Sequence, residues 1–131
     1  MRTTVLVAAL TFFVGSNAIA QNKTNTEKIA AIFPADQFES KVELQSFYTR
    51  LLNERIQIEY LPLTNEDKFP LLSTVPLNNK YNSSLKSVSE EDFDSATFNV
   101  LAYQLPFFDT GSYVHIYRID RSDYILKILP Q

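Results

Sequence analysis

His115 is the only histidine in the 131-residue chain, and histidine is the most common general base in enzymes. A nucleophile–histidine–acid triad would need it, but no Gly-x-Ser-x-Gly elbow or similar motif supplies the serine. A zinc site would have to rest on this histidine and carboxylates, because the chain has no cysteine. We therefore interpret His115 as a packing residue and predict no catalytic residue, no metal ligand and no cofactor.

The densest acidic run is Glu90-Glu91-Asp92-Phe93-Asp94. Its carboxylate oxygens suit a hard cation such as Ca²⁺, but the run lacks the alternating spacing and central glycine of an EF-hand loop. Paired carboxylates also catalyse glycoside hydrolysis, yet the sequence places no two of them across a cleft. We favour a solvated start of a short helix at Ser87, where acidic side chains are stabilised by the helix dipole.

The first twenty residues have the pattern of a secretory signal peptide. Arg2 is followed by an apolar run over residues 5–14 and by Ala18-Ile19-Ala20, an A-x-A cleavage site. The apolar run is too short to span the roughly 30 Å core of a bilayer. We expect cleavage near Ala20 and a secreted or periplasmic mature chain.

Composition limits the classes of partner. The chain carries 12 Lys and Arg against 15 Asp and Glu, a formal net charge of −3, which disfavours nucleic acid. No long apolar run follows residue 20, so we expect no transmembrane segment in the mature chain. The absence of cysteine means that packing alone must hold the fold. We predict a lead segment over residues 21–35, with residues 21–27 disordered, and a single domain over residues 36–131.

The main helix is expected to start at Ser40, because Ser40-Lys41-Val42-Glu43 fits the capping box. We expect it to end near Asn53. Its apolar residues fall at helical spacing, which is typical of one buried face: Leu44, Phe47, Tyr48, Leu51 and Leu52.

Beyond residue 55 the apolar period changes to two. Residues 56–60, 113–119 and 124–129 read as strands, and residues 69–77 and 103–108 as shorter ones interrupted by proline. We predict an α+β fold, with one main N-terminal amphipathic helix packed on an antiparallel sheet of about four to five strands that ends in a C-terminal hairpin. This order of elements is similar to that of cystatin-like folds, a resemblance of architecture that implies no function.

The C-terminal hairpin is expected to turn about Arg121-Ser122, which places His115 opposite Ile128 and Tyr117 opposite Leu126. One face then carries Tyr113, His115, Tyr117, Ile119, Tyr124, Leu126 and Ile128, and the other carries Val114, Ile116, Arg118, Ile125, Lys127 and Leu129. We expect the first face to be core and the second to lie outside, because burying two cations is costly. In the alternative, the tyrosine face (Tyr113, His115, Tyr117 and Tyr124) is open and receives a sugar or a peptide.

These patterns favour a small non-enzymatic domain that binds a protein or a cell-envelope component through the second face of the hairpin. One alternative is a small secreted hydrolase that uses carboxylates or His115. Another is an inhibitor of a secreted enzyme that presents Arg121 or the polar loop over residues 78–84.

Overall fold

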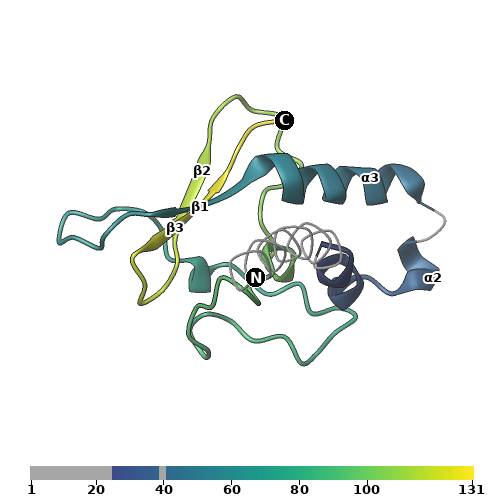
Figure 1. The fold of residues 1–131 in the computed structure, drawn as a ribbon, viewed down its shortest axis with the longest axis horizontal. Helices are drawn as coiled ribbons and strands as arrows, with labels where there is room; N and C mark the ends of the chain where they lie inside the picture. The colour runs from purple at the N-terminus through teal and green to yellow at the C-terminus, as the bar shows by residue number, and fades with distance from the viewer. Residues whose placement is uncertain (1–24, 39–40) are drawn as a thin grey trace, which may run out of the picture.

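The computed structural model describes residues 25–38 and 41–131, and these form an α+β fold (Figure 1). In the described residues the α-helices precede the strands, and the last two elements, both strands, complete the sheet. In chain order the elements are a helix over residues 25–32, α2 (Ala35–Phe38), α3 (Val42–Arg50), the π-helical turn η1 (Leu51–Arg55), β1 (Ile56–Tyr60), the 3₁₀ turns η2 (Leu72–Thr74) and η3 (Val100–Ala102), β2 (His115–Arg118) and β3 (Tyr124–Ile128).

Within the described residues, the sheet has three antiparallel strands in the order β1-β3-β2. β2 and β3 form the C-terminal hairpin, in which His115 lies opposite Ile128 and Tyr117 opposite Leu126, so the predicted register is confirmed. β1 pairs with the other edge of β3, with Ile58 opposite Leu126. The hairpin register follows from the strict alternation of apolar residues, since a slip of one residue would expose the whole buried set.

The prediction of four to five strands is wrong. Residues 69–77 and 103–108 make only isolated bridges, one between Leu71 and Arg118 and one between Leu77 and Tyr103. Proline has no N–H to give to a strand ladder, so residues 69–77 keep only two isolated bridges and residues 103–108 only one. The prolines concerned are Pro70, Pro76 and Pro106.

The apolar stripe of the main helix is confirmed, but the ends of the helix differ from the prediction. Tyr48 and Leu51 are buried, and the remaining stripe residues pack against the core. α3 begins at Val42 with Lys41 as its N-cap and no side-chain capping bond, while Ser40 lies outside the described residues. Asn53 does not end the helix, because η1 continues the chain in a wider turn up to β1.

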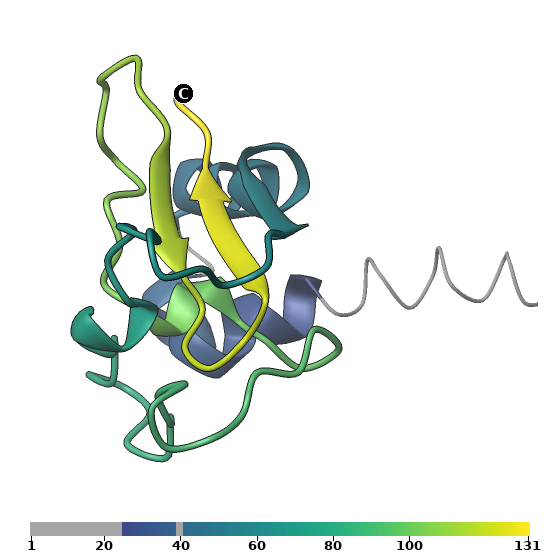
Figure 2. The same ribbon diagram turned by 90° about the vertical axis from the view of Figure 1, so that its left-hand side faces the viewer.

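α3 does not lie across the sheet as predicted. Figure 1 shows α3 running away from the strands, and in Figure 2 it is seen nearly end-on behind them. The reason is that η1 passes directly into β1 without a loop, so the helix cannot fold back over the sheet. The order on which the similarity to cystatin-like architecture rested, a helix followed by antiparallel strands, is present, but the helix lies beside the sheet.

The predicted disordered lead is helical from residue 25 onward. Ile32 is buried in the core, and Ile29 and Phe33 pack against it. The Asn99 side chain also donates a hydrogen bond to the Lys28 carbonyl at 2.9 Å. This apolar face is what orders the segment, despite its polar composition further upstream.

The short helix expected from Ser87 is a single turn, in which the Ser87 carbonyl accepts from the amides of Glu90 and Glu91.

The core lies between the helices, the inner face of the sheet and the long loops. Its buried members are Ile32, Tyr48, Leu51, Leu72, Val88, Val100, Leu101, Ala102, Tyr103, Leu105, Phe107, Ile119, Leu126 and Ile128. The loop residues among them show that the segments between β1 and β2 supply much of the packing.

Among the described residues, no helix has both the length and the apolar character that crossing a membrane requires. The predicted signal peptide lies outside the described residues and stays a prediction.

Residues 61–71, which we call the covering segment, cross the outer face of the sheet from one edge to the other (Figure 2). At the β1 end, the Leu61 amide donates to the Asp123 carbonyl at 2.7 Å. At the β2 end, the Arg118 amide donates to the Pro70 carbonyl at 2.8 Å. The sheet is thus covered on both faces, by the core inside and by this segment outside.

Candidate functional site

The predicted outer face of the hairpin is only partly open. Arg118 is 1% exposed and Ile125 2% exposed, because the covering segment lies over them. Ile116, Lys127 and Leu129 are half-buried and Val114 is exposed. The structure therefore does not bring the six predicted binding residues together into one open surface.

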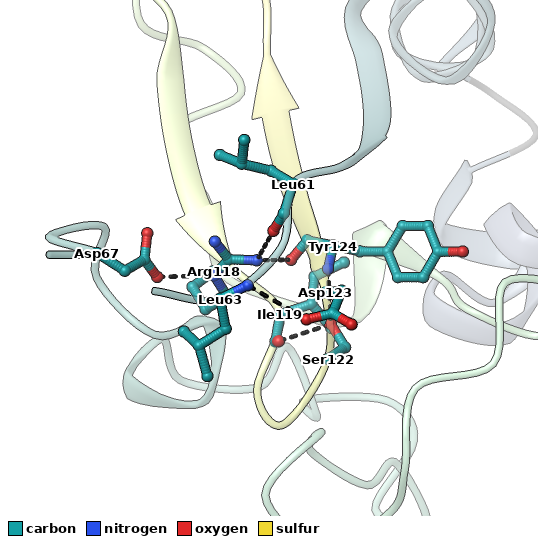
Figure 3. Close-up of polar contacts among 8 residues, drawn as sticks. All are labelled: Leu61, Leu63, Asp67, Arg118, Ile119, Ser122, Asp123 and Tyr124. Atoms are coloured by element: carbon teal, nitrogen blue, oxygen red, sulfur yellow. Dashed lines mark hydrogen bonds and ion pairs between the residues drawn. The ribbon is translucent and has the colours of Figure 1, made fainter. Parts of the chain in front are cut away.

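Arg118 is buried, against the expectation that it lies in solvent. Its Nε donates to Asp67 Oδ2 at 2.7 Å, and its Nη1 donates to the Leu61 carbonyl at 2.6 Å and to the Tyr124 carbonyl at 3.3 Å (Figure 3). Its Nη2 is buried without a hydrogen-bond partner in the part of the chain that the structure describes. A carboxylate and two carbonyls replace the water that burial removes, so the cost of burying the charge is largely offset.

The tyrosine face is divided between the two ends of the hairpin. Tyr113 contacts the His115 ring edge-on, with ring centroids 5.4 Å apart, at one end. Tyr117 is half-buried against the core, and burial raises the pKa of its phenol. Tyr124 lies at the other end, with its ring directed away from Arg118 (Figure 3). These residues therefore form no single platform.

His115 and Asp109 are within hydrogen-bonding distance, with Nε2 2.7 Å from Oδ2. The Gly111 amide donates to the other oxygen of Asp109 at 3.0 Å, and this bond, followed by the one from His115, lowers the pKa of the Asp109 carboxyl. Gly111 also lets the Tyr113 ring approach, since a Cβ at Gly111 would lie 3.0 Å from ring atoms. The arrangement fixes the loop after Phe108. A histidine paired with a carboxylate needs a nucleophile to perform acyl transfer, and the hydrogen bonds described for this pair include none.

A continuous row of aromatic rings runs from Tyr60 through Tyr124 to Tyr103, and we call it the aromatic row. Tyr60 and Tyr124 meet edge-on across β1 and β3 at 5.6 Å, and Phe93 meets Tyr124 at 5.6 Å. Phe98 follows Phe93 at 5.3 Å, and Tyr103 follows Phe98 at 6.2 Å. Tyr60 is 65% exposed whereas Tyr103 is buried, so the row leads from the surface inward.

The inner end of the aromatic row lies in a groove of about 700 Å³. Phe93, Phe98 and Tyr103 line it, and Glu91, Asp92 and Asp94 bring carboxylates to it. The Tyr103 hydroxyl accepts from the Val88 amide at 3.0 Å, which holds the groove wall in place. Burial raises the pKa of the Tyr103 phenol.

The acidic run beside this groove forms no metal centre. Among the described residues, no group of three His, Asp or Glu side chains is close enough to hold a metal ion. Arg121, at the tip of the hairpin, lies 3.3 Å from Asp92 and donates to the Val88 carbonyl at 2.7 Å. The tip of the hairpin therefore contacts the groove wall, while the Arg121 side chain stays 56% exposed.

Sequence reasoning missed the aromatic row and the groove. Its rings come from β1, β3 and the loops over residues 93–103, and only Tyr124 was among the predicted site residues. A correct prediction that β1 pairs with β3 would have placed Tyr60 opposite Tyr124, because these two residues are partners in that pairing. In comparisons with known proteins, no family model, no curated protein and no solved structure matches this chain.

Proposed function

We propose that this protein is a non-enzymatic binding domain that acts outside the cytoplasm, and that the aromatic row and its groove receive a segment of a partner protein. The observation that carries the proposal is the row itself, which runs from the exposed Tyr60 to the buried Tyr103. Aromatic side chains dominate the energetics of interfaces because each offers a large rigid apolar area with a polar edge.

The charges beside the row favour a particular kind of partner segment. Glu91, Asp92 and Asp94 line the groove with the rings of Phe93 and Phe98, and these three carboxylates outnumber the two nearby cations, Lys86 in the lining and Arg121 beside Asp92. A lysine or arginine side chain is attracted both to carboxylates and to ring faces. The row is therefore suited to an extended segment that combines apolar residues with basic ones.

Selection from a random peptide display library tests the proposal. The protein is purified after expression of the full-length sequence, and selected peptides are measured against Tyr60→Ala and Phe93→Ala. We expect each variant to lose at least tenfold in affinity, which is about 1.4 kcal/mol or more, because residues of this kind form interface hot spots.

The matched control is Tyr81→Ala, since Tyr81 is 43% exposed and lies outside the row. It should bind the selected peptides as the native protein does. Equal affinity in all three variants would refute the assignment of the row. A parallel array of envelope glycans covers the other class of ligand, and binding there without selected peptides would replace the protein partner by a glycan.

A further inference from the structure

We propose that β1 is a dimerisation edge, at which a second copy of this chain pairs with it antiparallel about a two-fold axis at Ile58. The two edge strands, β1 and β2, differ in whether another segment of the chain bonds to their outer backbone groups. The β2 edge is covered by the chain itself, through the bond from Arg118 to Pro70 and the bridge from Arg118 to Leu71. β1 has β3 as its strand partner, and no other segment of residues 25–38 and 41–131 pairs with it.

The backbone of β1 points its free groups outward at alternate residues. The Arg55 carbonyl accepts from Leu129 and the Leu61 amide donates to Asp123, so the odd-numbered residues bond toward β3. Ile58 and Tyr60 therefore turn their N–H and C=O groups to the open edge. Unpaired strand groups of this kind are a template for another strand.

The sequence of β1 selects one register for a second copy. Centring the two-fold axis on Ile58 pairs all five residues, and it places Ile58 opposite itself and Tyr60 opposite Ile56. These are the residues whose backbone groups face the edge, so the hydrogen bonds match. Centring on Glu59 would instead bring two like charges directly opposite, which is destabilising.

Side chains also complement one another in this register. On the outer face, Gln57 lies opposite Glu59 of the second copy, and Glu59 already has a cation beside it, since Lys127 Nζ lies 2.8 Å from its Oε2. On the inner face, Ile56 lies opposite the exposed Tyr60. Leu61, which is 41% exposed just beyond β1, lies opposite Arg55, so the pairing also covers apolar surface. The result is a continuous sheet with β1 and its copy at the centre.

Analytical ultracentrifugation of the purified full-length expression product tests association. We expect a monomer–dimer equilibrium that shifts toward dimer as concentration rises. A single monomeric species at every concentration up to about 1 mM would overturn the proposal.

Single cysteines test the register, because the native chain has none. A mixture of Gln57→Cys and Glu59→Cys should form a disulfide-linked heterodimer, since directly opposite residues in a non-hydrogen-bonded pair have Cα atoms about 4.5 Å apart. Each variant alone places its two cysteines diagonally, at about 7–8 Å, which is too far for a disulfide. We expect the mixture to cross-link at least about tenfold faster than either variant alone.

Both substituted side chains are exposed on the outer face, so neither substitution should prevent folding, and thermal unfolding checks this. A mixture of Thr64→Cys and Glu66→Cys, both exposed in the covering segment, gives the rate of random collision. The proposal is overturned if the Gln57/Glu59 mixture is no faster than this control. It is also overturned if Gln57→Cys alone cross-links as fast as the mixture, which would indicate a different register. Neither cysteine lies in the aromatic row, and cross-linking is measured without peptide because Tyr60 belongs both to the row and to the paired edge.

Discussion

Arg118 of β2 and Asp67 of the covering segment form a 2.7 Å ion pair, which ties this segment to the outer face of the sheet. The side chains of the pair are only 2% and 10% exposed. An ion pair of this kind differs from a surface pair, because removing one member leaves an uncompensated buried charge. The covering segment and Arg118 are therefore expected to stabilise each other.

We predict that Asp67→Ala lowers the free energy of unfolding by about 3–5 kcal/mol, the usual cost of breaking a buried pair from one side. Arg118→Met removes the charge and should cost less, and the double variant should be more stable than Asp67→Ala alone. Chemical denaturation of the native protein and the three variants gives the coupling energy, which we expect to be favourable by about 1–3 kcal/mol.

The exposed pair of Glu59 and Lys127 provides the matched control for this cycle. The two side chains are 45% and 26% exposed, with Nζ 2.8 Å from Oε2. Their coupling should not exceed about 1 kcal/mol, because water screens exposed pairs. A coupling for Arg118 and Asp67 that is no larger than this would show that burial adds nothing to the pair.

Periodicity explains what the sequence could predict. The spacing of Leu44, Tyr48 and Leu51 fixes the buried side of α3 and the start of η1, and the alternation along residues 115–128 fixes the register of the hairpin. Both are local patterns, so they survive without knowledge of tertiary contacts. The same alternation places Arg118 on the outer face, but it carries no information about which distant segment crosses that face. The burial of Arg118 was therefore unpredictable from the pattern.

The aromatic row could not be predicted from local sequence patterns for the same reason. Phe93 and Phe98 lie in loops with no periodic pattern, and their place beside Tyr124 depends on how the long segment between β1 and β2 folds. Proline, in contrast, acts locally, because its missing N–H interrupts a strand ladder wherever it stands. Pro70, Pro76 and Pro106 account for the strands that were predicted and are not formed.

Asp109 should make stability depend on pH in the acid range. The Gly111 amide, and then His115, hold the folded-state pKa of this carboxyl below its ordinary value of 3.8. A lowered carboxyl pKa contributes stability that is present above the unfolded-state pKa and is lost as the pH falls through the folded-state pKa. We expect the native protein to be more stable than Asp109→Asn at pH 5, and the difference to shrink as the pH falls below 3.8.

Denaturant unfolding of both proteins at several pH values between about 5 and 2 measures this difference. Asparagine keeps an oxygen that can accept from Gly111, so the backbone turn is retained and the charge is the main change. A stability difference that stays constant over this pH range would contradict the prediction. A carbon-detected NMR titration of Asp109 supplies the second test, with a midpoint expected below 3.8.

Arg55 joins three parts of the chain, and we predict that its guanidinium geometry, not its charge alone, is required. Its Nε donates to the Leu129 carbonyl at 2.9 Å and its Nη2 to the Phe107 carbonyl at 3.0 Å. The group also lies over the Phe47 ring, 5.7 Å from the centroid, and burial lowers its pKa. Lysine carries the same charge but lacks the planar fork that reaches two carbonyls at once.

Arg55→Lys should therefore lower the free energy of unfolding by about 1–3 kcal/mol, the cost of leaving one buried carbonyl without a donor. Arg50→Lys is the matched control, because Arg50 is exposed on α3 one turn earlier, and it should change stability by no more than about 0.5 kcal/mol. Thermal and denaturant unfolding of the two variants measure both effects. If the two substitutions had equal effects, the carbonyl contacts of Arg55 would contribute no more than its charge, and the connection between η1 and the C-terminal segment would rest on apolar packing instead.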